Sequence, residues 1–374
     1  MKLVSLTDIC RPKQWKTISM KDFTEKGYSV YGANGKIGWY SEFNHKEETL
    51  LITCRGASCG SVNISEPYSY INGNAMALDS LSKDVYIKYL YYYLKNTSLK
   101  DCISGSAQPQ ITKLGLDRVQ IPLPPLPEQK RIATILDKAD ALRQKSKQQL
   151  AAYEELLQAT FLDMFGDPVT NPKGWEEVNL GGVIDGIESG WSPKCESSPR
   201  KGNNTWAILT LSAVSERNYL DNKNKKLPDS LSPKENIEVK PNDLLFSRKN
   251  TRELVGACAY VFKTPPKLLL PDTIFRIKYQ PLLLNGIFTS FLFNDRNFRR
   301  KIQKLATGSA GSMPNISKEK LKNLSIPLPP LNLQNHFAQI VQNIEAQKTL
   351  LKQSMQENED LFNALVQKAF KGEL

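Results

Sequence analysis

The sequence predicts an α+β protein built from two repeated halves, in which each globular domain is followed by a long helix. The hexapeptide Ile-Pro-Leu-Pro-Pro-Leu occurs at 121–126 and again at 326–331, an offset of 205 residues. A long stretch without proline follows each copy, at 128–165 and at 333–370. Solenoid repeats are only about 20–50 residues long, so this spacing indicates a duplicated half-molecule.

The repeat divides the 374 residues into four segments. We expect a globular domain at 1–120, a Pro-rich elbow and helix at 121–168, a second globular domain at 169–325, and a second elbow and helix at 326–374. Strand-like runs in the globular parts lie at 48–53, 60–64, 205–210, 243–247 and 256–262, and helices are expected near 85–96 and 286–305. This mixture is typical of α+β domains.

The proline-rich elbow indicates where the first helix begins and where it ends. Prolines at 124, 125 and 127 favour a start near Glu128, and Gly166 followed by Pro168 favours the end. At ~1.5 Å per residue, such a helix is about 58 Å long.

Apolar residues recur on one face of both expected helices. In the first helix they begin with Ile132, Ile135, Ala139 and Leu142, a heptad-like spacing. We therefore expect two antiparallel, coiled-coil-like helices related by a pseudo-two-fold axis. The alternative is that each helix packs only on its own domain. Candidate partner-binding residues on the two stripes are Leu142, Leu150, Tyr153, Leu157, Ile344, Leu351 and Met355.

The positive charge of the chain lies on the globular parts. The chain carries +12 at pH 7 and has a pI near 9.2. Residues 1–120 carry +4 and residues 169–325 carry +10, whereas each helical segment carries −1. A surplus of this kind indicates a polyanionic partner, with nucleic acid the first candidate. The globular domains are therefore expected to contact the polyanion, and the helices to act as spacers.

Several enzyme classes lack the sequence features that they need. The chain has no P-loop, no cofactor fingerprint of a methyltransferase, and only His45 and His336, so we expect no catalytic or metal site. One pattern, Asp229 followed by Glu238 and Lys240, fits the loose PD…ExK spacing of Mg²⁺-dependent nucleases. A Mg-dependent nuclease therefore stays as the alternative function, and a coiled-coil adaptor without DNA function as a third.

The remaining composition is that of an intracellular protein. Six cysteines without a CxxC pair indicate reduced thiols, and the first ten residues lack the apolar core of a signal peptide. No apolar run reaches the ~18 residues of a membrane-spanning helix. We expect a cytoplasmic protein with no membrane partner.

Several motifs resemble those of target-recognition domains in type I restriction–modification systems. In the first half they lie at 32–35, 53–60, 71–73 and 105–111, and in the second half at 190–193, 240–248 and 308–316. The repeated hexapeptide, followed once by Glu-Gln-Lys-Arg-Ile-Ala at 128–133, resembles the conserved helical regions of this family. The second elbow departs from the first, because it reads Leu-Asn-Leu-Gln at 331–334.

This resemblance covers nearly the whole chain and implies a DNA specificity subunit, which is not itself an enzyme. It implies a bipartite, asymmetric double-stranded DNA target, with each target-recognition domain reading one half. The implied partners are modification methyltransferase subunits, two of them by symmetry, and a restriction/translocase subunit. S-adenosylmethionine, ATP and Mg²⁺ would belong to those partners, and this chain would hold no cofactor.

The loop from Arg248 to Arg252 is the clearest candidate for DNA contact. Arginine can bind guanine through two hydrogen bonds and asparagine can bind adenine, while lysine favours phosphates. The alternative for residues 248–252 is a solvated loop with one structural arginine. The alternative for the basic residues of the helix expected at 286–305 is a solvated helix face. The candidate DNA-binding residues are Tyr31, Asn34, Lys36, Arg55, Gln108 and Gln110 in the first half, and Lys194, Arg248, Lys249, Asn250, Arg252, Arg299, Arg300, Ser309 and Asn315 in the second.

Overall fold

A computed structural model describes residues 2–33, 35–105, 109–308 and 313–374 of the chain. The chain forms two compact units. Unit 1 comprises Met1–Gln148 with Leu351–Leu374, and unit 2 comprises Gln149–Leu350. The long helices α4 (Leu126–Phe165) and α9 (Leu331–Lys371) each contribute to both units.

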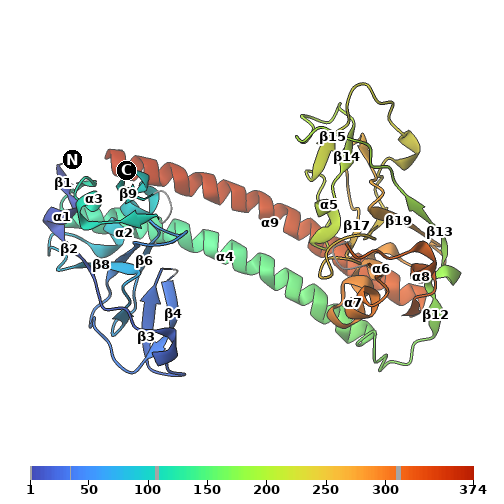
Figure 1. Cartoon of the computed structure of the whole chain (residues 1–374), viewed down its shortest axis with the longest axis horizontal. Coiled ribbons are helices and arrows are strands. Elements are labelled where there is room, and N and C mark those ends of the chain that lie inside the picture. The colour runs from blue at the N-terminus through green and yellow to red at the C-terminus, as the bar shows by residue number, and fades with distance from the viewer. Residues whose placement is uncertain (1, 34, 106–108, 309–312) are drawn as a thin grey trace. The chain divides into compact units, whose positions relative to one another are not determined.

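Unit 1 contains a four-stranded and a three-stranded sheet (Figure 1). The antiparallel four-stranded sheet has the order β2 (Arg11–Gln14), β8 (Ala75–Asp79), β5 (Leu50–Thr53), β6 (Val62–Ile64). The three-stranded sheet has the order β4 (Gly35–Tyr40), β3 (Tyr28–Gly32), β7 (Tyr70–Ile71), with β3 and β7 parallel. The other elements are β1 (Leu3–Ser5) paired with β11 (Gln120–Pro122), β9 (Ile103–Ser104) paired with β10 (Gln110–Ile111), the helices α1 (Leu6–Ile9), α2 (Ile87–Asn96) and α3 (Lys113–Leu116), and the 3₁₀ turns η1 (Met20–Asp22) and η2 (Lys100–Cys102).

Unit 2 repeats this arrangement. Its antiparallel four-stranded sheet has the order β13 (Ile184–Ser189), β19 (Ile274–Tyr279), β16 (Leu244–Ser247), β17 (Cys258–Tyr260). Its three-stranded sheet has the order β15 (Asn224–Lys226), β14 (Ala207–Leu209), β18 (Leu268–Leu269), with β14 and β18 parallel. The other elements are β12 (Glu177–Asn179) paired with β20 (Ser325–Pro327), the helices α5 (Ser212–Ser215), α6 (Gly286–Asn294), α7 (Arg296–Gln303) and α8 (Lys318–Lys322), and the 3₁₀ turns η3 (Leu180–Gly182) and η4 (Glu235–Ile237).

The two units therefore share one topology. Strand for strand, the order and the direction of pairing agree in both sheets, and β1–β11 corresponds to β12–β20. The central strand of the larger sheet, β8 or β19, is followed in each unit by a helix, α2 or α6. The predicted fold class, two repeated α+β domains with two long helices, is confirmed.

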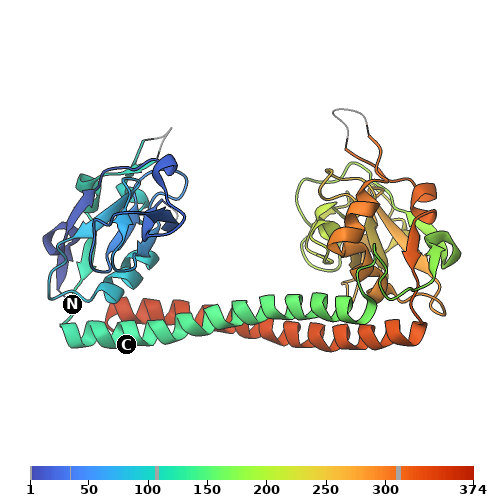
Figure 2. The same ribbon diagram turned by 90° about the horizontal axis from the view of Figure 1, so that it is seen from below.

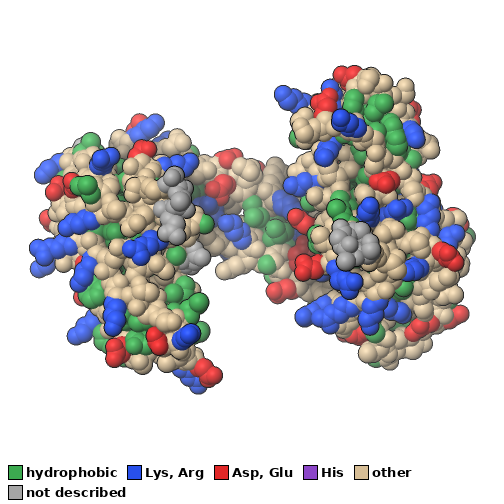
Figure 3. All heavy atoms as spheres, viewed as in Figure 1, with side chains coloured by type: hydrophobic (Ala, Val, Ile, Leu, Met, Phe, Trp, Pro, Cys, Tyr) green, Lys and Arg blue, Asp and Glu red, His purple; other side chains and the backbone are tan. Residues whose placement is uncertain are grey.

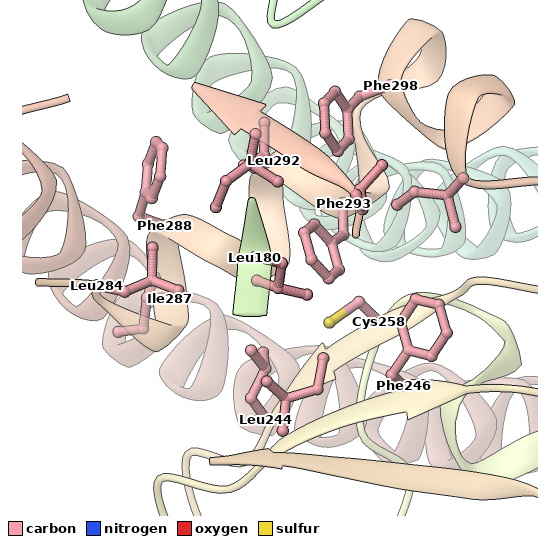
Figure 4. Close-up of a cluster of buried hydrophobic side chains, with 14 of the residues drawn as sticks. Leu180, Leu244, Phe246, Cys258, Leu284, Ile287, Phe288, Leu292, Phe293 and Phe298 are labelled. Atoms are coloured by element: carbon pink, nitrogen blue, oxygen red, sulfur yellow. The ribbon is translucent and has the colours of Figure 1, made fainter. Parts of the chain in front are cut away.

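Aromatic side chains form much of the core of unit 2. Phe246 and Cys258 from the larger sheet belong to one buried cluster with Phe288 and Phe293 from α6 (Figure 4), and the ring centroids of Phe246 and Phe293 are 6.0 Å apart. The rings of Phe293 and Phe298 stack with their centroids 6.2 Å apart. This core fastens α6 and α7 to the sheet whose strand ends carry several of the candidate residues.

The helix expected at 286–305 is broken into α6 and α7 at Asp295. The backbone of Asp295 is extended, with φ −53° and ψ 141°. Its carboxylate accepts hydrogen bonds from the backbone amides of Asn297 and Phe298, each at 2.9 Å, so it caps α7. A polar Asn-Asp pair inside an otherwise continuous helical pattern was the only sequence sign of this break.

In each unit α4 and α9 lie side by side and run in opposite directions (Figure 2). Their apolar contacts belong to the unit cores, with Ile132 and Phe362 in unit 1 and Phe161 and Phe337 in unit 2. Of the predicted stripe, Ile132 and Ala139 are buried, but Ile135 is only half-buried and Leu142 is 50% exposed, while Leu136, which the stripe omits, is fully buried. Among the described helices, none is long and apolar enough to cross a membrane.

A cluster of three charged residues joins the two helices in unit 1. Arg143 of α4 donates two hydrogen bonds to Glu359 of α9, at 2.8 and 2.9 Å, and a third to Asp140 at 3.2 Å. The guanidinium also lies over the ring of Phe362, 4.1 Å from its centroid. Around Arg143 the interface between the two helices is therefore polar. For this reason a purely apolar stripe does not describe the whole interface.

The same cluster recurs in unit 2 at the 205-residue offset. Lys348 of α9 lies 2.6 Å from Glu154 of α4 and 2.5 Å from Glu345, and only 4% of its side chain is exposed. Burial alone would lower the pKa of Lys348, but the hydrogen bonds with the two carboxylates outweigh it and raise the pKa above its ordinary value. Equivalent ion pairs thus set the pairing of the helices in both units.

A buried glutamine fastens the start of α4 to unit 1. The side chain of Gln129 is fully buried. Its amide oxygen accepts a hydrogen bond from the backbone amide of Tyr86 at 2.8 Å, just before α2. Its amide nitrogen donates to the backbone carbonyls of Asp84 and Pro124, each at 2.8 Å.

Gln334 does the same for α9 in unit 2. It is also fully buried, and its amide oxygen accepts a hydrogen bond from the backbone amide of Asn285 at 2.9 Å. Its nitrogen donates to the carbonyls of Leu283 at 3.2 Å and Pro329 at 2.8 Å. The second elbow therefore lacks the Pro-Glu-Gln-Lys sequence of the first but keeps the glutamine that makes the contact.

Candidate nucleic-acid interface

In both units the loop after a central strand of the larger sheet is held by the same backbone contacts. In unit 1 the backbone of Cys54 bonds to Asn74 and Ile111, each at 3.1 Å, and Arg55 is bridged to Gln110. We call this loop, residues 54–60, together with Gln110 and Ile111, strand-end site 1.

Strand-end site 2 is the equivalent loop of unit 2, residues 248–256, together with Asn315 and Ile316. The backbone of Arg248 bonds to Thr273 at 3.1 Å and to Ile316 at 2.8 Å, and Lys249 is bridged to Asn315. In Figure 2 the orange segments on either side of residues 309–312 lie on the side of unit 2 away from the long helices. Position by position, Cys54 corresponds to Arg248, Arg55 to Lys249 and Gln110 to Asn315.

The side chains of site 1 are mostly uncharged. Cys54 is fully buried, its thiol accepts a hydrogen bond from Gln14 Nε2 at 2.8 Å, and burial raises the pKa of the thiol. Arg55 is exposed, and Gln110 is half-buried at its side. Site 1 therefore offers one cation and one amide to a ligand.

Site 2 is more basic. Arg248 is half-buried with its guanidinium 5.1 Å from the ring centroid of Phe275, and Lys249 and Arg252 are exposed. Two buried polar atoms of this site, Arg248 Nε and Asn315 Oδ1, have no hydrogen-bond partner among the residues that the structure describes. Such groups are rare in native interiors because leaving them unpaired is unfavourable by about 1–3 kcal/mol.

A row of cations flanks site 2. Arg296 and Arg300 of α7 and Lys304, the residue that caps its C-terminal end, are four residues apart and exposed, so they share one face. Within the described part of the chain none of the three forms an ion pair, and Figure 3 shows Lys and Arg side chains gathered over α7. The predicted candidate Arg300 therefore lies on a surface suited to phosphates.

Three of the predicted DNA-binding residues are buried, and we correct them. Tyr31 is 7% exposed, and its hydroxyl accepts a hydrogen bond from the backbone amide of Glu66. Asn250 is 4% exposed, and its amide nitrogen donates to Ser215 Oγ at 3.0 Å. Arg299 is 5% exposed. Sequence reasoning could not see that the loop of unit 2 folds back onto α5 and α7, which takes Asn250 and Arg299 away from solvent. Tyr31 is buried for a separate reason, because it lies on β3 with its hydroxyl bonded to Glu66.

Two further candidates are exposed, and three lie outside the described residues. Lys36 is exposed, forms an ion pair with Glu66 at 3.4 Å and lies over the ring of Trp39, and Lys194 is exposed in its loop. Asn34, Gln108 and Ser309 lie outside the described residues.

Asp229 and Glu238, the two acidic residues of the nuclease pattern, bond to different partners. Asp229 is exposed and pairs with Lys226 at 3.3 Å. Glu238 accepts a hydrogen bond from the backbone amide of Lys267 at 2.6 Å and forms an ion pair with Lys240. Among the described residues, no three His, Cys, Asp or Glu side chains gather as a metal site would require. Nothing therefore supports the nuclease alternative.

The chain thus holds two copies of one α+β frame, each ending in a loop that carries cationic and amide side chains, an arrangement suited to a polyanionic ligand. Residues 1–152 and 172–359 match the family model described as the type I restriction modification DNA specificity domain. The chain belongs to this family. The membership confirms the predicted class, a component that confers DNA specificity and is not the catalytic subunit.

Known proteins resemble the chain over different lengths. It is 24% identical over 381 residues to the MjaVIII specificity subunit of Methanocaldococcus jannaschii, covering 89% of this chain and 87% of that protein. It is 32% identical over 167 residues to the EcoEI specificity subunit of Escherichia coli, which is 45% of this chain but only 28% of that protein. The crystal structure of the S subunit from M. genitalium matches 99% of this chain and 96% of its own, with a TM-score of 0.67 and 14% identity, and thus shares the fold.

Proposed function

We propose that the chain reads a bipartite, asymmetric DNA site as part of a type I restriction–modification complex. The domains at 1–120 and 169–325 would each read one half of the target. The observation that carries this proposal is the equivalence of the two strand-end sites, which keep one backbone frame but place different side chains at matching positions. Two sites that share a backbone frame but carry different side chains are suited to reading two DNA half-sites of unrelated sequence.

The side chains of site 2 suit base and phosphate contact. The guanidinium of Arg248 and the amide of Asn315 would meet base edges, because these groups match guanine and adenine in the major groove. Lys249 and Arg252 would contact phosphates, which fix the position of the protein on the duplex. Arg300 would add a phosphate contact beside them. In site 1 the same roles would fall to Arg55 and Gln110, with Lys36 as a phosphate contact.

The long helices would bind the partner subunits. Leu157 is buried in the core of unit 2, so we leave it out of the proposed partner surface. Leu150, Tyr153, Ile344, Leu351 and Met355 are half-buried, whereas Leu142 is 50% exposed. Leu156 and Leu361, which are related by the 205-residue offset, are 51% and 49% exposed. Two equivalent apolar surfaces of this kind favour two methyltransferase subunits.

The cofactors of the reaction would stay with those partners. We assign S-adenosylmethionine to the methyltransferase, and ATP and Mg²⁺ to the restriction/translocase subunit. We also place the chain in the cytoplasm, where a complex that binds DNA would act.

The test is to express the chain with a methyltransferase subunit encoded beside it, in a host without DNA methylation, and to map methylated bases across the genome. We expect a single motif with two unrelated halves and a gap of fixed length. A soluble complex of both proteins that methylates no motif would contradict the proposal.

A further inference from the structure

The loop of site 2 is held in place from two sides. Its first part is fixed by Asn250, whose amide nitrogen bonds to the hydroxyls of Ser215 and Ser247 at 3.0 and 3.4 Å. The amide oxygen of Asn250 accepts a hydrogen bond from the backbone of Thr251 at 2.9 Å. Lys249 and Arg252, the exposed cations, therefore project from a braced backbone.

The second part of the loop is held by α7. Arg299 donates hydrogen bonds to the backbone carbonyls of Glu253 at 3.2 Å and Leu254 at 3.0 Å. Gln303, one helical turn later, donates to the carbonyl of Glu253 at 2.9 Å. The exposed loop residues thus lie between one brace from Asn250 and another from α7.

Arg299 is an unusual residue for this position. Its side chain is almost fully buried, and within the described residues no carboxylate forms an ion pair with it. Burial, together with the nearby charge of Arg217, lowers its pKa to about 10. An uncompensated buried cation is unfavourable unless its donors are used, and here the loop carbonyls use them.

We propose that Arg299, assisted by Gln303, is a positioning residue that sets the loop 249–254 for reading the half-site of unit 2. It acts through the loop backbone and does not touch DNA. Arg300, the next residue, is exposed, about 100° around α7 from Arg299. This inference rests on the proposed function of site 2.

Among the described residues, no helix side chain braces the loop of site 1 as Arg299 and Gln303 brace the loop of site 2; the hydroxyl of Ser58 donates instead to the carbonyl of Ala33 at 3.4 Å. The loop of site 1 closes on itself, with the amides of Cys59, Gly60 and Ser61 bonded to the carbonyls of Gly56, Thr53 and Ser58 at 2.8–3.0 Å. After α2, where unit 2 has α7, the described part of unit 1 has the turn η2. A substitution at Arg299 should therefore change the reading of one half-site and spare the other.

The test compares Arg299→Met and Arg299→Lys with the matched control Arg300→Gln, each in the full complex with its methyltransferase. Binding is measured on duplexes with one mismatch in either half-site, over a range of salt concentrations. For Arg299→Met we expect discrimination at the unit 2 half-site to fall about tenfold, with the other half-site and the salt dependence unchanged. Arg299→Lys should retain part of the discrimination, because its ammonium can reach one of the two carbonyls.

Arg300→Gln should behave in the opposite way. The slope of log affinity against log salt should fall by about 0.9, the value for one lost phosphate contact, while discrimination stays the same. If Arg299→Met instead lowers the salt slope and weakens matched and mismatched DNA alike, Arg299 is a phosphate contact and the inference is overturned. Equal loss at both half-sites, or no change at either, would overturn it too.

Two further variants remove the remaining ambiguities. If Arg299→Met does not assemble, Gln303→Leu removes a single donor of the same brace and should reduce discrimination at the same half-site. Lys249→Gln with Arg252→Gln tests the site itself. If that pair leaves binding to DNA unchanged, the proposed function of site 2 fails, whatever Arg299 does. If the pair weakens binding while Gln303→Leu and Arg299→Met change nothing, only the positioning role fails.

Discussion

Units 1 and 2 share their strand order but differ in how they build the loop that would meet DNA. In unit 1 a short turn closed by its own backbone presents Arg55, and the position before it is the buried Cys54. In unit 2 a longer loop presents Lys249 and Arg252, and the matching position holds Arg248. A constant backbone frame thus lets the reading side chains vary without changing the fold.

The two globular segments also differ in net charge. Residues 169–325 carry +10 against +4 for residues 1–120. Part of this surplus lies on α7, which unit 1 replaces by the turn η2. Unit 2 would therefore supply more of the affinity that depends on salt, while both units would supply specificity.

Replacing the elbow glutamines should produce the largest effect on stability. Gln129→Leu and Gln334→Leu each remove three hydrogen bonds of a fully buried side chain and leave backbone groups unpaired. We expect each to lower the free energy of unfolding by about 3 kcal/mol in urea titrations. Gln339→Leu, on the exposed face of α9, is the control. A much smaller effect of one elbow variant would show that the two halves are not equivalent.

Arg55→Gln and Arg248→Gln should separate the two reading sites. Each should reduce discrimination at its own half-site by about 10- to 100-fold, the range for losing a bidentate base contact. Fluorescence anisotropy with duplexes mismatched in one half provides the measurement, and Lys138→Gln on α4 controls for loss of one charge. If both variants affect the same half-site, the assignment of one site to each unit is wrong.

The cations of α7 should act on salt dependence alone. Arg296→Gln and Lys304→Gln should each lower the slope of log affinity against log salt by about 0.9, because each would lose one phosphate contact. The mapped recognition motif should not change. Lys371→Gln near the end of α9 should leave the slope as it is, and an equal change for that variant would point to a general effect of net charge.

The charged clusters between the helices should give the smallest effect. Glu359→Gln and Glu154→Gln should each lower the free energy of unfolding by about 0.5–1 kcal/mol, since both carboxylates are partly screened by solvent.

The pH dependence of the Lys348 cluster has a defined sign. Because the pKa of Lys348 is raised in the folded chain, its stabilising contribution is complete below the ordinary lysine value of about 10.4 and is lost as the pH rises through the raised value. Thermal melts should show the same difference between Glu154→Gln and the parent chain at pH 6 and pH 9. A difference that vanishes between those values would contradict this assignment.

The sequence predicted the repeat, the fold class and the long helices because each leaves a local signal. A copied proline-rich hexapeptide and two long stretches without proline are visible without any knowledge of packing. The elbow glutamines were also detectable, because Gln129 and Gln334 stand 205 residues apart like the rest of the repeat. Their role was missed because a polar residue in the first turn of a helix usually faces solvent.

The candidate residues were harder to judge, because charge in a sequence does not show which way a side chain points. Arg299 and Arg300 are neighbours in one basic run, yet the first is buried against the loop and the second is exposed. Asn250 stands between two exposed cations but bonds inward. Leu142 and Leu157 were assigned to one apolar stripe, but Leu142 is exposed and Leu157 is buried. Between them the helices meet through the ion pair of Arg143 with Glu359, which interrupts the apolar stripe.

The central claim is that each unit reads its own half of one site, and an exchange of domains tests it most directly. Residues 169–325 would be replaced by the corresponding domain of a family member with a different motif, and methylated bases would be mapped across the genome of the host. We expect one half of the motif to change while the other half stays the same. A change in both halves, or in neither, would contradict the claim.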